Sequence, residues 1–344
     1  MPSPVTLLPV VEEIPADLET PVSAYLKLTP AGATFLLESV ELGENLGRYS
    51  FIGAGSREVI SARAGVVTIT AAGVVTTSPL PAARPLSVVR DRLRGYTIQP
   101  HPSVPRLPGG AVGYVGYDYV RSLERLPDRL PDPLGLPLFT FHIADTLVVF
   151  DHVKRKMLLV ALDAEGEATG GRPPARARIA ELERALRGPL PEIPRGPAPP
   201  DARVQFVSNV EEARFCDAVR RAKRHIALGD IFQGVLSHRM SGPIAVHPFQ
   251  IYRALRILNP SPYMFYFDFP AADGVPPWQL IGSSPEVHAK LERGAALIRP
   301  IAGTRPRGGT PEEDARLARE LLADEKERAE HVMLIDLARN DLGR

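Results

Sequence analysis

The stretch 299–309 reads RPIAGTRPRGG, and the elements expected on either side of it define the fold. An apolar strand runs into a turn at Gly303, and Thr304 and two arginines follow. Backbone amides beside a glycine, a hydroxyl and guanidinium groups would suit a carboxylate or phosphate ligand. An ordinary surface turn with solvated arginines fits the same residues. The sequence carries neither the glycine fingerprint of a dinucleotide-binding fold nor a P-loop, which argues against a doubly wound nucleotide fold.

Strands and helices around this loop follow an α+β order. Apolar and β-branched runs predict strands at 65–70, 73–77, 143–151, 156–162, 231–236, 263–269, 279–282, 287–291 and 295–299. Periodic apolar positions predict helices at 175–187, 211–228, 248–258 and 324–340. Capping residues support these assignments. Ser208 and Glu211 have the spacing of a capping box, Gly229 is a helix stop, and Thr310 followed by proline and two acids predicts a further helix start.

A proline-rich segment divides the chain. Residues 189–200 read PLPEIPRGPAPP, a composition that lacks backbone donors and favours an extended linker. We therefore predict an N-terminal region at 1–188, a linker at 189–203 and a C-terminal region at 204–344.

Charge and composition exclude several classes of protein. The 344 residues carry 41 Lys and Arg against 40 Asp and Glu, a net charge of +1, so no basic excess drives nucleic-acid binding. No apolar stretch approaches the roughly 20 residues of a membrane span, and the N-terminus lacks the positive segment of a secretory signal. Cys216 is the single cysteine, which leaves no internal disulfide and no cysteine-based zinc site. We expect a cytoplasmic protein that contacts neither nucleic acid nor membrane.

The charged helix 324–340 could bind a metal ion. Glu327, Glu330 and His331 stand at i, i+3 and i+4 and therefore share one helix face. Mg²⁺ takes one or two protein carboxylates together with substrate oxygens, so this face would suit it. A solvated charged face with neighbouring Lys and Arg is the alternative, and on spacing alone it is the commoner arrangement.

Two further turns could carry chemistry. Glu286 follows an apolar strand; facing a pocket it would serve as a general acid or base, and otherwise it would be a solvated cap. Tyr263 and Met264 follow two prolines and could stack on an aromatic ligand, or they could be core residues.

Together and in this order, these segments resemble the chorismate-utilising enzyme family, on its anthranilate synthase branch. The matching segments are LETPV (18–22), LLES (36–39), GGAVGY (109–114), GDIFQ (229–233), NPSPYM (259–264), SPE (284–286), PIAGTRPRG (300–308) and the stretch from DEKE to ND (324–341). The resemblance implies an α+β fold in which two stacked antiparallel β-sheets are flanked by helices, with the substrate between the sheets.

The resemblance also implies a reaction. Members of this branch add ammonia to chorismate and eliminate pyruvate to give anthranilate in tryptophan biosynthesis. By this likeness Glu286 would be the catalytic carboxylate near the departing hydroxyl, Gly303 and Thr304 would bind chorismate, and Glu330 would bind Mg²⁺. Ammonia would come from glutamine through a partner amidotransferase subunit, component II.

Feedback inhibition by L-tryptophan is implied in the same way. The residues that match the regulatory positions of the family are Ser39, Pro262, Tyr263 and Met264.

Two positions separate this branch from its relatives. Relatives that add water have a lysine base at the position of Gln233, and aminodeoxychorismate synthases typically have a lysine at the position of Ala302. Neither the glutamine nor the alanine side chain can take over the chemical role of the lysine amine at these positions. The remaining alternatives are an aminodeoxychorismate synthase component I and a non-catalytic fragment that binds tryptophan or a partner.

The family continues past the motif at Asn340 and Asp341. Its later part supplies a second metal-binding Glu, a catalytic His and a glycine loop for a substrate carboxylate, and none of these motifs occurs here. We therefore expect a chain, and a fold, that are incomplete at the C-terminus.

Overall fold

The computed structural model describes residues 4–39, 47–105, 107–127, 130–165, 172–193, 204–272 and 274–343. The chain forms two compact units, one built from Met1–Pro191 together with Tyr252–Arg344, the other from Glu192–Ile251. The linker and region bounds expected from the sequence stay a prediction, since 194–203 lies outside the described residues.

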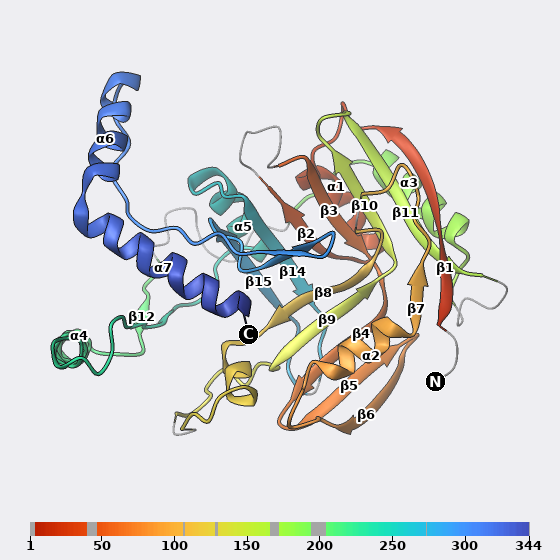
Figure 1. Cartoon of the computed structure of the whole chain (residues 1–344). Helices are drawn as coiled ribbons and strands as arrows, with labels where there is room; N and C mark the ends of the chain where they lie inside the picture. Colours follow the sequence, from red (N-terminus) through yellow and green to blue (C-terminus); the bar gives the residue numbers. More distant parts are fainter. Residues whose placement is uncertain are drawn as a thin grey trace. The chain divides into compact units, whose positions relative to one another are not determined.

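The larger sheet of the first unit combines strands from distant parts of the chain (Figure 1). Its eight strands run in the order β15 (Trp278–Ser284), β14 (Tyr263–Phe269), β2 (Ala33–Glu38), β3 (Tyr49–Ala54), β10 (Thr146–Asp151), β11 (Lys156–Ala164), β1 (Val5–Pro15) and β7 (Tyr96–Ile98). Neighbours are antiparallel except β1 and β7, which pair in parallel. The β14–β2 pairing sets Met264 opposite Glu38.

A second, five-stranded antiparallel sheet packs against the first. Its order is β6 (Val74–Pro79), β5 (Val66–Ala71), β4 (Ser56–Arg63), β9 (Phe139–Ala144) and β8 (Gly110–Val115). One hydrophobic cluster joins Phe35, Leu147 and Phe267 of the larger sheet to Val112 of the smaller one. The expected α+β class is confirmed, and the parallel strand β7 is the departure from the expected antiparallel sheets.

The predicted strand 143–151 is wrong in its extent, because it consists of two strands in two sheets. β9 ends at Ala144 in the smaller sheet and β10 begins at Thr146 in the larger one. Asp145, 2% exposed, lies at the change of sheet and pairs with Arg57, Arg172 and Arg178. Both halves are buried, so their apolar pattern runs on without a visible break.

Helices cover both sheets. α1 (Pro21–Leu28) and α3 (Ala175–Arg187) contact strands of the larger sheet, and α2 (Ser87–Arg94) buries Val89 in the cluster of the smaller sheet. The bounds predicted for α3 are confirmed, and its apolar stripe, Ile179, Leu182 and Leu186, is buried.

The rest of the first unit agrees with the predictions except at 287–291, where the strand is shorter and begins only at Lys290, because 287–289 have no pairing strand within the described residues. It contains the end of α5 (Pro248–Leu258), the hairpin β16 (Lys290–Glu292) and β17 (Ala295–Leu297), α6 (Pro311–Ala323) and α7 (Glu325–Gly343). Thr310 caps α6, since its Oγ1 accepts a hydrogen bond from the Glu313 amide at 3.2 Å. Within the described residues, no helix is long and apolar enough to cross a membrane.

The unit Glu192–Ile251 corrects two predictions. It contains β12 (Val207–Ser208), α4 (Glu212–Leu228) and β13 (Met240–Ser241), and Gly229 ends α4 with a positive φ as expected. The capping box is absent: Glu211 is the N-cap without a side-chain hydrogen bond, and Ser208 Oγ bonds the backbone of Val210 instead. The strand predicted at 231–236 does not form, because these exposed residues have no pairing strand within the described part of the chain.

Candidate active site

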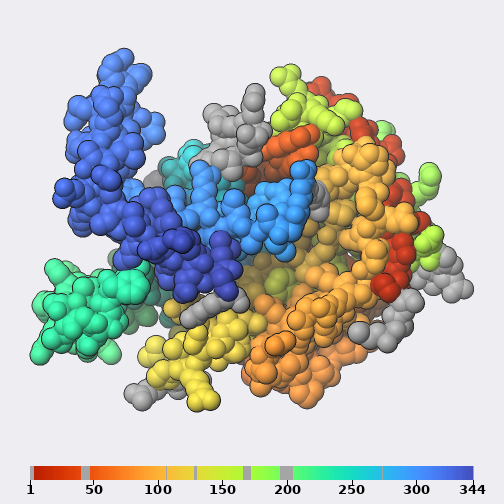
Figure 2. Space-filling model, in the orientation of Figure 1, coloured from red at the N-terminus to blue at the C-terminus, as the bar shows by residue number. Residues whose placement is uncertain are grey.

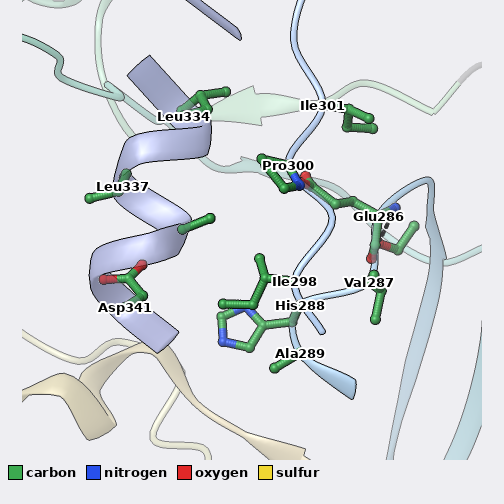
Figure 3. Close-up of a pocket in the computed structure, with 12 residues that line it drawn as sticks. Glu286, Val287, His288, Ala289, Ile298, Pro300, Ile301, Leu334, Leu337 and Asp341 are labelled. Carbon is green, nitrogen blue, oxygen red and sulfur yellow. Dashed lines mark hydrogen bonds between the residues drawn. The ribbon is translucent and has the colours of Figure 1, made fainter. Parts of the chain in front are cut away.

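A cavity of about 680 Å³ lies between α7 and the chain that follows β15 (Figure 3). It is lined by Ser284, Glu286, Val287, His288, Ala289, Ile298, Pro300, Ile301, Leu334, Leu337, Ala338 and Asp341. Figure 2 shows α7 in dark blue beside the lighter blue segment that holds β16 and β17. Most of the wall is apolar, and the ionisable groups on it are Glu286, His288 and Asp341. A pocket of this size, apolar with a few polar groups, is typical of a small-molecule site.

The turn after β15 fixes the backbone of Glu286. The Ser284 hydroxyl accepts a hydrogen bond from the Glu286 amide at 3.4 Å and donates one to its carbonyl at 3.1 Å. This local bonding by serine is typical of a tight turn. The backbone of Glu286 is therefore held at the end of the sheet, and its side chain lines the cavity.

Glu286 also lines a second cavity, of about 230 Å³. Its other walls include Pro262, Tyr263 and Arg299. Tyr263 stands opposite Ser284 in the β14–β15 ladder, so it lies beside the end of the strand that leads to Glu286.

The loop with Gly303 packs tightly against the start of α7. Gly303 has φ +83°, a conformation that favours glycine. A Cβ placed there would lie 3.0 Å from Glu327 Oε2 and 3.1 Å from Leu321 Cδ1. Thr304 follows with an exposed side chain. The close packing and the positive φ thus explain why position 303 is a glycine. The Thr304 side chain is accessible to a ligand.

Arg305 is bound within the protein, which corrects the expectation that both loop arginines are open to a ligand. Its guanidinium donates to Asp324 at 2.6 Å and lies 3.6 Å from Glu327 and 3.5 Å from Glu320. These contacts raise the pKa of Arg305, chiefly through the hydrogen bond with Asp324. The pKa of Asp324 is lowered, first by the Glu327 backbone amide and then by Arg305. Arg305 therefore fastens the loop to α6 and α7.

Of the two glutamates on the predicted metal-binding face, Glu330 is the one left unpaired among the described residues. Within the described residues it forms no hydrogen bond or ion pair, whereas Glu327, one turn earlier, lies near Arg305. His331 Nδ1 is buried and has no hydrogen-bond partner in that part of the chain. The described residues contain no group of three His, Cys, Asp or Glu side chains arranged around a metal ion. Of the three side chains on the predicted helix face, one carboxylate, that of Glu330, is therefore available. It could serve as a single protein ligand to Mg²⁺.

The predicted regulatory residues come together at one end of the β2–β14 pair. Ser39 follows Glu38, which pairs with Met264, so Ser39 lies next to the position of Tyr263. Pro262 and Met264 are buried, and Tyr263 is 39% exposed. The Ser39 hydroxyl is buried and finds no hydrogen-bond partner in the described chain. Such an orphaned group is uncommon in a folded protein and fits a ligand contact.

Sequence reasoning missed the role of Glu38. Its side chain is 2% exposed and bonds to Tyr252 and Arg256 of α5. A glutamate inside the apolar run FLLE was the available signal, because a buried carboxylate needs a partner.

The two positions used to separate the branches lie in different units. Ala302 is half-buried in the loop before Gly303. Gln233 belongs to Glu192–Ile251 and is exposed in a segment without helix or strand.

Comparison with known proteins identifies relatives along nearly the whole chain. Residues 33–344 match a family described as chorismate binding enzyme. Anthranilate synthase component 1 of Thermus thermophilus is 47% identical over 330 residues, which are 96% of this chain and 67% of that relative. The protein of the same name from Acinetobacter calcoaceticus is 42% identical over 345 residues, 98% of this chain and 68% of that one.

Solved structures agree. Anthranilate synthase component I from Streptococcus pneumoniae superposes with a TM-score of 0.70 at 31% identity, covering 97% of this chain and 69% of that one. The isochorismate synthase MenF from Escherichia coli has a TM-score of 0.54 at 14% identity, with 98% and 64% covered, which shows a common fold alone. With this agreement in sequence and in structure, the chain belongs to the chorismate binding enzyme family, on the branch of the anthranilate synthase component 1 enzymes.

Proposed function

We propose that this protein aminates chorismate and releases pyruvate to form anthranilate, with tryptophan as a feedback inhibitor. The observation that carries the proposal is the position of Glu286, which lines both the cavity beside α7 and the smaller cavity beside Tyr263. One carboxylate thus borders the proposed substrate and regulatory regions. The names of the relatives supply the reaction.

Glu286 is the proposed general acid. Loss of the ring hydroxyl of chorismate needs a proton on the departing oxygen, and a positioned carboxylic acid can deliver it. The Ser284 turn holds the Glu286 backbone, and the Glu286 side chain lines the cavity.

The loop at Gly303 and Thr304 is the proposed binding segment for a chorismate carboxylate. The Thr304 hydroxyl is exposed, and Arg305 holds the loop against α6 and α7. A hydroxyl and backbone amides on a fixed loop can bind an oxyanion without being reorganised.

Glu330 is the proposed magnesium ligand. Its side chain is partly exposed and unpaired within the described residues, and Mg²⁺ needs only one or two carboxylates when the substrate supplies further oxygens. When bound, the ion would neutralise a carboxylate of chorismate.

Ser39, Pro262, Tyr263 and Met264 form the proposed tryptophan site. The orphaned hydroxyl of Ser39 offers a hydrogen bond, and Tyr263 offers a partly exposed aromatic ring. An aromatic amino acid needs both kinds of contact. The nitrogen source is proposed to be ammonia from a glutamine amidotransferase subunit, as the component number in the names of the relatives suggests.

A fluorescence assay tests the reaction. The full-length protein is given chorismate, Mg²⁺ and ammonium, and anthranilate is followed by its fluorescence and by chromatography. Glu286→Gln should lower kcat by about 10²–10⁴-fold, since it removes the general acid. Formation of 4-amino-4-deoxychorismate in place of anthranilate would assign the protein to the aminodeoxychorismate synthases.

A further inference from the structure

A buried charge cluster lies directly behind the proposed tryptophan site. Glu38 accepts a hydrogen bond from the Tyr252 hydroxyl at 2.5 Å. Arg256 donates to both oxygens of the same carboxylate, Nε to Oε2 at 3.0 Å and Nη2 to Oε1 at 3.2 Å. The Glu38 side chain is 2% exposed and that of Arg256 is 34% exposed. A buried carboxylate held by a two-pronged guanidinium is a strong and directional contact.

The cluster ties together the two segments that carry the site. Glu38 is the last residue of β2, and Ser39 follows at once. Arg256 lies near the end of α5, and the chain then passes through 259–261 into Pro262 and β14. The contact therefore lies immediately before Ser39 on one segment and shortly before Pro262 on the other.

The connection from α5 to β14 is itself held in place. The Asn259 amide bonds to the Leu255 carbonyl at 2.8 Å, which continues the last turn of α5. The Ser283 hydroxyl donates to the Asn259 carbonyl at 2.7 Å and lies 2.7 Å from the Ser261 hydroxyl. Because these hydrogen bonds hold 259–261, a displacement of α5 would also displace Pro262.

We propose that Arg256 and Tyr252 are positioning residues for the regulatory site, acting through Glu38 to keep Ser39 at the correct spacing from 262–264. Neither residue is proposed to touch tryptophan, chorismate or the reacting atoms. This inference rests on the proposed tryptophan site. Its physical basis is that removing the guanidinium leaves a buried carboxylate uncompensated, so the end of β2 must move to reach water.

The first variant is Arg256→Gln, with Arg253→Gln as its matched control. Arg253→Gln removes the same charge at an exposed position of the same helix. In Arg256→Gln the tryptophan concentration for half-inhibition should rise by about tenfold or more, which corresponds to about 1.4 kcal/mol of lost binding. The kcat and the KM for chorismate without tryptophan should stay within about twofold, because the catalytic residues are untouched. The control should match the unsubstituted protein in all three quantities.

Two conservative variants separate positioning from general damage. Tyr252→Phe keeps the buried ring, which packs edge-on to Tyr266, and removes only the hydroxyl bond, so it should fold and shift the tryptophan response in the same direction by a smaller factor. Arg256→Lys keeps the charge without the fork and should restore part of the response that Arg256→Gln loses. A purely structural role would instead lower kcat together with the tryptophan response.

Calorimetric titration with L-tryptophan completes the test. Weaker tryptophan binding in Arg256→Gln and Tyr252→Phe, with intact turnover, supports the positioning role. Equal binding by both variants and by the unsubstituted protein would overturn that role and leave the tryptophan site standing. Absence of tryptophan binding by the unsubstituted protein would overturn both.

Discussion

At Gly303 one hydrogen in place of a side chain decides where the loop that holds Gly303 and Thr304 can lie. The residue combines a positive φ with close contact to α7, so both its backbone and its surroundings require glycine. Glu327, on the other side of this contact, is also near Arg305. The position of the loop therefore depends on packing as much as on hydrogen bonds.

Substituting Gly303 by alanine should damage catalysis. The strained φ costs about 1–3 kcal/mol, and the new Cβ would push against Glu327 at 3.0 Å. We expect kcat/KM for chorismate to fall by about tenfold or more, measured in the anthranilate assay. Gly65→Ala is the matched control: Gly65 has φ +78° and open space around it, so this variant should lose stability without losing kcat/KM. Equal activity of the two variants would contradict the steric argument.

Among the elements, α3 is fastened to the sheets by one arginine. Arg178 donates from Nε to the Pro173 carbonyl, from Nη1 to the Thr146 hydroxyl and from Nη2 to the Leu162 carbonyl and to Asp163. Its side chain is 6% exposed, and it also pairs with Asp145 where the chain changes sheets. This one side chain therefore holds the helix, β10 and β11 together.

Replacing Arg178 by methionine should destabilise the fold strongly. The change leaves Asp145 with less compensation in a buried position, and breaking a buried pair costs about 3–5 kcal/mol. Urea denaturation at neutral pH measures the loss. Arg187→Met is the control on the same helix, because Arg187 is 77% exposed and, among the described residues, pairs with Glu183 one turn away and with no other acid. That surface pair contributes about 0.5 kcal/mol or less, and similar losses in both variants would refute the role of Arg178.

The elements also show what a sequence can predict. The helix at 175–187 was predicted with its correct bounds because its apolar stripe and terminal glycine act locally. The break at Asp145 was missed because it depends on arginines from three other segments. The strand at 231–236 was wrong because an apolar run becomes a strand only with a partner to pair with.

At the scale of the whole molecule, the packing of the two sheets includes a buried histidine. His142 is fully buried, and its ring stacks on Phe269 with centroids 5.3 Å apart. Nδ1 lies 2.9 Å from the Ser56 hydroxyl, and Nε2 has no partner within the described residues. Burial lowers the pKa of His142 to about 4, so the folded protein keeps this ring neutral.

This histidine should make folding stability depend on pH. The folded pKa lies below the unfolded value of 6.5, so between pH 6.5 and pH 4 the unfolded chain binds a proton that the folded chain does not. The free energy of unfolding is therefore highest above pH 6.5 and decreases as the pH falls toward 4. The loss should reach about 2 kcal/mol at pH 5, measured by urea denaturation at pH 7 and pH 5. His142→Phe keeps a ring against Phe269 and should lack this part of the dependence. The same pH dependence in the variant would assign it to other groups.

The candidate site was predictable only in part for a related reason. Glu286, Gly303 and Glu330 stand in motifs that the sequence displays, but their partners do not. Arg305 was expected to be open to a ligand, and it is engaged by acids of α6 and α7. Glu38 was not singled out, since its partners lie far along the chain on α5. Contacts between distant segments are set by the whole fold, and local patterns do not encode them.

The pairing of β14 with β2 has a consequence for synthesis on the ribosome. β2 leaves the ribosome early, whereas the strand that covers its outer edge is made more than two hundred residues later. Until then the nascent chain presents the open edge of β2 in an otherwise complete set of N-terminal strands, and open edges invite wrong pairing. Wrong pairing at this edge is therefore a hazard of synthesis that ends only when β14 is made.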